Sequence, residues 1–242
     1  MYEPMILLHG VGLDRTVFKG LQDELPMETH AYDYRGSGDG PDWKSEASLG
    51  QLAQDLWKEA DEKGWDRFAL CGFSFGAMIA QYAALDRPER ISHLILLNAV
   101  FNRTELQRDA VRARLQMAQR EGTQAIIEAA LSRWFTEDFA PQPLVAATRS
   151  RLEGNSEEQF LKNYALFAEG DAQLAPRVAE IDCPVFVATG ALDQGSTPEM
   201  SKGLADAIPN GVAKIYDRAA HFLPLQFPKE LARDIVQWME ET

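Results

Sequence analysis

Short apolar runs alternate with longer stretches of helical periodicity along most of this 242-residue chain, and this alternation limits the folds open to it. The predicted strands span residues 5–8, 29–32, 67–71, 93–97, 184–189 and 213–216. The predicted helices span residues 49–63, 75–85, 198–207 and 228–240. Strands that alternate with helices predict an α/β fold, with a mainly parallel sheet of about six strands and crossover helices on its faces.

The strand pattern stops between residues 101 and 173 and resumes at the run CPVFVATG. The intervening stretch predicts three or four helices and no strand. An all-helical insertion between two core strands most simply forms a cap over one end of the sheet. We therefore expect an α/β core formed by residues 1–100 and 174–242, and a helical cap formed by residues 101–173.

A single serine, Ser74, lies in the stretch GFSFG at residues 72–76, between a buried strand and an apolar helix. Gly and Ser are common enough that G-x-S-x-G arises by accident in roughly one chain of this length in ten. The strand before it and the helix after it make the match more specific. This arrangement is the nucleophile elbow, a tight turn that lifts the serine hydroxyl above the sheet.

A serine hydroxyl needs a base to remove its proton, and the chain contains four histidines. Loops that follow parallel strands gather at the edge of the sheet where ligands bind. His9 and His221 follow predicted strands in this way, whereas His30 and His93 lie at the starts of strands. Only His221 is compatible with the chain order Ser, Asp, His, so we expect it to be the base.

The imidazole needs a carboxylate that fixes its tautomer and stabilises its charge. Asp193 lies in the loop after the next-to-last strand, in PVFVATGALDQGSTP, and is our choice. Asp182 precedes that strand and falls at the wrong edge, and Asp171 lies in the cap. Asn98 occupies another position typical of the acid but cannot carry the charge.

The stretch HGVG at residues 9–12 follows the first strand, and its small residues let backbone N–H groups face a ligand. We expect the N–H groups of Val11 and Phe75 to form an oxyanion hole. His9 is expected to hold this loop by hydrogen bonding.

Taken together, HGVG, GFSFG, ALD and AAH, in this order, resemble the α/β-hydrolase superfamily. The stretch DYRGSGDG at residues 33–40 is similar to that family's D-x-R-G-x-G-x-S turn, with Asp39 in place of the usual final serine. The resemblance implies a Ser74-His221-Asp193 hydrolase with a helical cap and with no metal or organic cofactor. This chain starts at the HG strand, without the family's leading hairpin, so six strands are expected.

Two cap segments, AVFNRTE at 99–105 and SRWFTEDF at 132–139, look like those of 3-oxoadipate enol-lactonases. The resemblance implies an anionic lactone, which would need a cation such as Arg133 or Arg103. The commoner situation is that such arginines are solvated or paired with acids of the cap. Trp134, Arg133 and Phe135 are the candidate substrate contacts, and a small carboxylic ester or lactone is the expected substrate.

Several other functions use the same residues. Hydrolysis of a C–C bond, amide hydrolysis and cofactor-free perhydrolysis need the same triad, and a receptor that binds a ligand with slow turnover could retain it. The net charge of −13 and pI of about 4.8 disfavour nucleic acid and anionic membranes as partners. The sequence start resembles no signal peptide, and no apolar run is long enough to span a bilayer, so a cytoplasmic location is expected.

Overall fold

The computed structural model describes residues 2–136, 139 and 141–242, and within them it shows a six-stranded sheet whose neighbouring strands are all parallel. The strand order is β2-β1-β3-β4-β5-β6. The strands are β1 (Met5–Leu8), β2 (Thr29–Ala31), β3 (Phe68–Phe73), β4 (Ile91–Leu97), β5 (Val185–Gly190) and β6 (Gly211–Tyr216). The prediction of an α/β fold with a parallel sheet of about six strands is confirmed.

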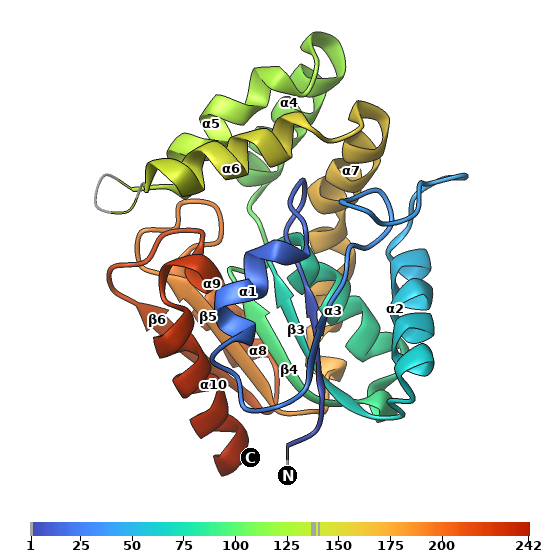
Figure 1. Ribbon diagram of the computed structural model, residues 1–242, viewed down its shortest axis with the longest axis vertical. Helices are drawn as coiled ribbons and strands as arrows, with labels where there is room; N and C mark the ends of the chain where they lie inside the picture. The colour runs from blue at the N-terminus through green and yellow to red at the C-terminus, as the bar shows by residue number, and fades with distance from the viewer. Residues whose placement is uncertain (1, 137–138, 140) are drawn as a thin grey trace.

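Helices cover both faces of the sheet (Figure 1). One face packs against α2 (Leu49–Lys63), α3 (Phe75–Asp86) and α8 (Pro198–Ala207), and the other against α1 (Lys19–Gln22) and α10 (Pro228–Glu241). Successive side chains of a strand point to opposite faces, so Ile6 and Leu8 of β1 join the first apolar cluster and Met5 and Leu7 join the second. The sheet is thus the middle layer of three.

Local sequence signals set the ends of α2. The Ser48 hydroxyl oxygen accepts the backbone N–H of Gln51 at 3.1 Å, as an N-cap does, and Gly64 ends the helix with a φ of 71°. Both signals were visible in the sequence, and the helix has the predicted bounds.

Three strands, β3, β4 and β6, are longer than predicted. β4 begins at Ile91 rather than at residue 93 because Ile91 pairs with Phe68 of β3. β3 continues to Phe73 because residues 72–73 pair with residues 96–97 of β4, so the strand ends directly at the elbow. β6 begins at Gly211 because residues 211–212 pair with residues 185–186 of β5. β6 is an edge strand with several exposed residues, so its start lacks the apolar pattern that marks a buried strand.

Among the described residues of the insertion between β4 and β5 there are four α-helices. They lie above the sheet at the top of Figure 1, with α7 continuing down beside α3. They are α4 (Glu105–Glu121), α5 (Gln124–Trp134), α6 (Gln142–Glu153) and α7 (Glu157–Leu174). Phe167 of α7 packs edge-on against Phe75 of α3, with ring centroids 6.3 Å apart. The expected helical cap is therefore present, and it contacts the core at the start of α3.

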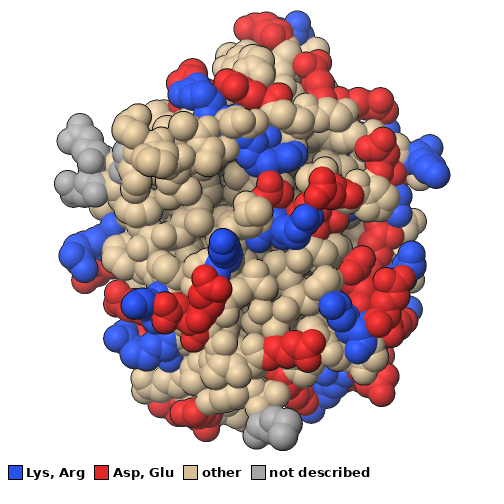
Figure 2. All heavy atoms as spheres, in the orientation of Figure 1, with Lys and Arg blue, Asp and Glu red and all other residues tan. Residues whose placement is uncertain are grey.

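Basic and acidic side chains are interspersed over the face shown in Figure 2. Within the described ranges, no helix is both long and apolar enough to cross a bilayer.

Candidate active site

Ser74 lies between β3 and α3 in a backbone conformation that L-residues rarely adopt, with φ 55° and ψ −113°. Such a conformation costs on the order of 1–3 kcal/mol and persists only where the surroundings enforce it. A Cβ added at Gly72 would lie 2.3 Å from the Gly76 carbonyl oxygen, and one added at Gly76 would lie 2.0 Å from the Leu8 carbonyl oxygen. The turn is therefore so tight that only glycine fits two residues before the serine and two residues after it.

His221 lies in the loop after β6, just before the short helix α9 (Leu223–Gln226). Its Nε2 atom is 3.2 Å from the Ser74 Oγ atom, and its Nδ1 atom is 2.8 Å from Asp193 Oδ2. An ionised carboxylate only accepts hydrogen bonds, so Nδ1–H donates to Asp193 and the Nε2 lone pair faces the serine hydroxyl. In this tautomer His221 can take the proton of Ser74.

Asp193 is buried in the loop after β5 and accepts several hydrogen bonds besides that from His221. Its Oδ1 atom accepts the backbone N–H groups of Gly195 at 2.9 Å and Ser196 at 3.0 Å. Burial alone would raise the pKa of this carboxyl, but the electrostatic interaction with the His221 imidazole and the donated hydrogen bonds outweigh burial and hold the pKa below its usual value. Asp193 is thus an ionised partner for the imidazole.

Asn98, whose position after a strand is typical of the acid, takes part in this site as a hydrogen-bond donor. Its Nδ2 atom donates to Asp193 Oδ2 at 2.9 Å and lies 3.1 Å from the Thr189 hydroxyl oxygen. The residue directly follows β4 and has a φ of 49°, a left-handed conformation that asparagine tolerates better than most residues. The sequence signal was its place after a core strand, which predicts proximity to Asp193 but not its role.

The loop that carries Val11 lies directly against the serine, since a Cβ added at Gly10 would be 3.3 Å from the Ser74 Cβ atom. Val11 and Gly12 are the central residues of a turn closed by the Leu13 N–H, which donates to the Gly10 carbonyl at 3.2 Å. Phe75 is the first residue of α3, where an N–H has no carbonyl partner within the helix. Both backbone N–H groups stay our candidates for the oxyanion hole.

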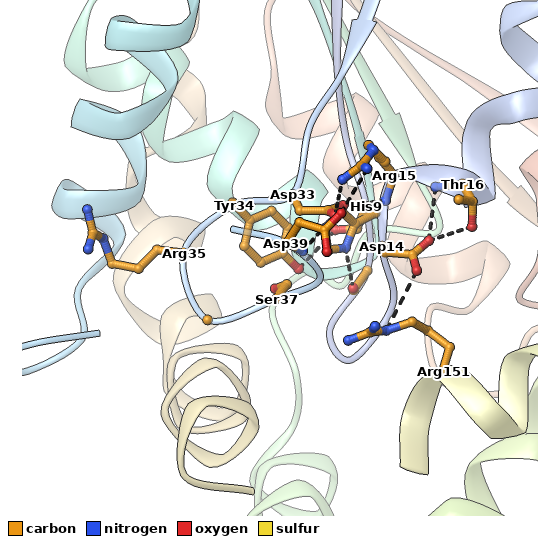
Figure 3. Close-up of polar contacts among 12 residues, drawn as sticks. His9, Asp14, Arg15, Thr16, Asp33, Tyr34, Arg35, Ser37, Asp39 and Arg151 are labelled. Atoms are coloured by element: carbon orange, nitrogen blue, oxygen red, sulfur yellow. Dashed lines mark hydrogen bonds and ion pairs between the residues drawn. The ribbon is translucent and has the colours of Figure 1, made fainter. Parts of the chain in front are cut away.

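His9 is buried. Figure 3 shows it close to Asp33 and Tyr34. Its Nδ1 atom is 2.9 Å from the Gly10 carbonyl oxygen, so Nδ1–H donates to that carbonyl, and its ring stacks on Tyr34 with centroids 4.2 Å apart. Burial lowers the pKa of His9 to about 4. The expectation that His9 holds the loop by hydrogen bonding is confirmed.

Arg15, which follows the loop that carries Val11, binds the stretch DYRGSGDG at residues 33–40 (Figure 3). The Arg15 guanidinium group pairs with Asp33, and it donates to Asp39 Oδ2 at 2.9 Å. Asp39, which stands where the resemblance expects serine, therefore adds a second carboxylate partner for Arg15.

A cavity of about 190 Å³ lies between the cap and the carboxyl ends of the strands, and Ser74 and His221 reach it. The Trp134 ring stacks on the His221 ring, with centroids 5.7 Å apart and planes 17° apart. Among the residues that the structure describes, the cavity is lined by Trp134 and Arg133 but not by Phe135. The Phe135 ring packs against Phe222, with centroids 5.0 Å apart, so the structure places it in the apolar core rather than in contact with substrate.

Three arginines of the cap segment, Arg103, Arg114 and Arg133, line this cavity. Arg103 is buried, donates to the Phe167 carbonyl at 2.9 Å and has its pKa lowered to about 10 by burial. Burial, and then the nearby charge of Arg114, lower the pKa of Arg133. Within the described part of the chain, none of the three forms a salt bridge to a carboxylate. The alternative that Arg103 is solvated or paired with an acid of the cap does not hold.

Comparison with known proteins gives a consistent result. A family model described as alpha/beta hydrolase fold matches residues 3–228. The chain is 27% identical over 242 residues to an (E)-2-((N-methylformamido)methylene)succinate hydrolase from Acinetobacter baylyi, covering 99% of this chain and 91% of that protein. It is 27% identical over 203 residues to 3-oxoadipate enol-lactonase 2 from the same organism, covering 82% and 73%. Among solved structures, a thermophilic esterase from Thermogutta terrifontis with malate bound has a TM-score of 0.88 at 25% identity, covering 99% and 90%.

Proposed function

Because the chain belongs to the alpha/beta hydrolase fold family, we propose that it is a serine hydrolase that cleaves a small carboxylic ester or lactone through an acyl-enzyme intermediate. The observation that carries the proposal is the chain of contacts from Ser74 Oγ through His221 to Asp193 at the wall of the cavity.

The reaction proceeds in two steps, acylation of Ser74 and hydrolysis of the acyl-enzyme. The His221 Nε2 atom takes the proton of Ser74 as the Oγ atom attacks the carbonyl carbon, and the N–H groups of Val11 and Phe75 bind the resulting oxyanion. The intermediate collapses as the C–O bond breaks, and the alcohol oxygen takes the proton from His221; the alcohol of an ester then departs, whereas the hydroxyl group of an opened lactone stays attached to the acyl group. His221 then deprotonates a water molecule that attacks the acyl-enzyme, and its proton returns to the Ser74 oxygen as the acid is released.

The three arginines of the cavity favour a substrate that itself carries a carboxylate. A buried cation without a carboxylate partner is costly, and an anionic ligand would offset that cost with charge-assisted hydrogen bonds. Two printed names agree with this, since one relative is named as a hydrolase of a substituted succinate and the esterase from Thermogutta terrifontis has malate bound. The cavity volume of about 190 Å³ suits an acid of a few carbon atoms. A carboxylate-bearing ester or lactone is therefore the substrate class we propose.

The first experiment is labelling with a fluorophosphonate probe, detected by intact mass, because this tests serine activation without a known substrate. We expect a single adduct on the wild-type protein and none on Ser74→Ala. Absence of an adduct on a folded wild-type protein would contradict a serine hydrolase and favour the receptor. Product analysis then separates ester or lactone hydrolysis from cleavage of C–C or amide bonds and from perhydrolysis.

The substrate class is tested with monomethyl succinate and methyl 4-methylpentanoate, in which an isopropyl group replaces the carboxylate. We expect kcat/KM to be about 10–100-fold higher for the anionic ester, because one or two charge-assisted hydrogen bonds to its carboxylate stabilise the bound state by the corresponding free energy. Arg133→Gln should reduce this preference, whereas Arg120→Gln, an exposed change near the end of α4, should not. Equal kcat/KM values for the two esters would contradict a carboxylate-bearing substrate.

A further inference from the structure

The turn that carries Val11 is held from the cap as well as from the core. Asn155, in the connection between α6 and α7, donates from its Nδ2 atom to the Gly12 carbonyl at 2.9 Å. The same amide nitrogen lies 3.1 Å from the carbonyl oxygens of Arg151 and Leu152 at the end of α6. The amide therefore joins the last turn of a cap helix to the residue after Val11.

Arg151 makes a second link between the cap and this loop. Its Nη2 atom donates to Asn155 Oδ1 at 2.7 Å, which fixes the orientation of the amide. Its Nε atom lies 3.7 Å from Asp14 Oδ2, and Figure 3 shows Arg151 reaching Asp14 from the cap. Asp14 in turn accepts the backbone N–H of Thr16 at 3.0 Å and so begins the helical turn that follows the loop. Residues of the cap thus contact the loop on both sides of Leu13, at Gly12 and at Asp14.

Side chains of the cap pack closely against the loop at Gly12. Gly12 is the third residue of the turn at residues 10–13 and has a φ of 74°, a value that glycine adopts readily in this position of a β-turn. A Cβ added there would lie 2.8 Å from the Phe160 ring and 2.9 Å from a methyl carbon of Leu152. On the core side, the turn is closed by Leu13 and held by His9. The direction of the Val11 N–H is therefore set jointly by cap and core.

We propose that Asn155, oriented by Arg151, is a positioning residue for the oxyanion hole, so that the hole is complete only when α6 is docked on the loop. Asn155 acts through the Gly12 carbonyl and does not touch the substrate. The proposal rests on the proposed function, in which Val11 supplies one of the two oxyanion donors. It makes the cap part of the catalytic geometry rather than only a wall of the cavity.

Asn163 of α7 provides a matched control, because it is also an asparagine that docks the cap on a core loop. Its Nδ2 atom donates to the carbonyls of Arg35 and Gly36 at 3.0 Å, and its Oδ1 atom accepts the Trp43 indole N–H at 3.0 Å. These partners belong to the loop after β2, which carries neither candidate oxyanion donor. Loss of Asn163 therefore weakens cap docking but removes no direct contact with the Val11 turn.

The test compares kcat, KM and melting temperature for Asn155→Ala, Asn155→Asp and Asn163→Ala, with monomethyl succinate as substrate. Asn155→Asp keeps the size of the side chain and the contact with Arg151 but cannot donate to the Gly12 carbonyl. We expect both Asn155 variants to lose about 10–100-fold in kcat with KM changed less than about 3-fold, because oxyanion contacts form only in the transition state. Asn163→Ala should lower the melting temperature at least as much and kcat by less than about 3-fold.

Unchanged kcat in both Asn155 variants would overturn the proposal, and so would an equal loss of kcat in Asn163→Ala, which would make cap docking the cause. The rate of fluorophosphonate labelling gives a second readout that needs no substrate, and it should fall in parallel with kcat. If the wild type is labelled at Ser74 and the Asn155 variants are labelled equally fast, the positioning role fails while the proposed function stands. A wild type that is neither labelled nor active overturns both.

Discussion

At the scale of single residues, unusual backbone conformations mark the site. Ser74 and Asn98 both have positive φ values, and both end a central strand of the sheet. Ser74 presents its hydroxyl to His221, and Asn98 presents its amide to the carboxylate that faces the other side of the same ring. The two residues with positive φ thus lie at the two ends of one chain of hydrogen bonds, which runs from Ser74 through His221 and Asp193 to Asn98.

The contribution of Asn98 can be separated from its backbone strain. Glycine tolerates a positive φ, so Asn98→Gly removes the amide without forcing the backbone to move. We expect kcat to fall about 10-fold, because Asp193 loses a donor and the imidazole loses part of its orientation. Steady-state kinetics with unchanged KM would support this assignment. A kcat equal to that of the wild type would show that the backbone donors to Asp193 suffice.

Burial of His9 predicts a particular dependence of stability on pH. The pKa of His9 is lowered to about 4 in the native protein, against about 6.5 in an unfolded chain. Between these values the unfolded chain binds a proton that the native protein does not, so the free energy of unfolding falls as the pH decreases from 6.5 to 4. The full difference corresponds to about 3 kcal/mol.

Urea unfolding at several pH values measures this dependence. His9→Asn retains a side-chain N–H for the Gly10 carbonyl but no titrating ring, so its free energy of unfolding should fall less over the same pH range. Parallel curves for the two proteins would mean that His9 is not the group responsible.

At the scale of elements, the sequence was informative wherever a local signal exists. Periodicity located all six strands, and Ser48 and Gly64 located the ends of α2. The elbow and the loops after strands were enough to name Ser74, His221 and Asp193, which the structure brings together. Which face of a cap helix meets the cavity depends on tertiary packing, so no local signal could distinguish adjacent residues at the end of α5.

Trp134 and Phe135 illustrate that limit and provide a matched pair of variants. Trp134 lines the cavity and stacks on His221, whereas Phe135 packs in the core. Trp134→Ala should enlarge the cavity and raise kcat/KM for methyl hexanoate relative to methyl acetate by about 10-fold, as loss of a large apolar wall predicts. Phe135→Ala should lower the free energy of unfolding by about 3 kcal/mol or more and leave this ratio unchanged. A change in the ratio of the two kcat/KM values in Phe135→Ala would mean that Phe135 contacts the substrate.

At the scale of the whole molecule, two electrostatic effects act on an anionic substrate with opposite sign. The chain carries a net charge of −13, so at long range the protein repels an anion, and this exposed charge is screened strongly by salt. The arginines of the cavity attract the anion at short range, and because Arg103 is buried and Arg133 is half-buried their attraction is screened far less.

Added salt should therefore raise kcat/KM for monomethyl succinate, the reverse of what a surface cluster of arginines would produce. From 20 to 200 mM salt, where the Debye length falls to less than about 10 Å, we expect an increase of about 2-fold to 3-fold. The neutral ester methyl 4-methylpentanoate should show no change over the same range, which controls for effects of salt on the catalytic step. A decrease with salt for the anionic ester would mean that exposed cations, rather than the buried arginines of the cavity, dominate its binding.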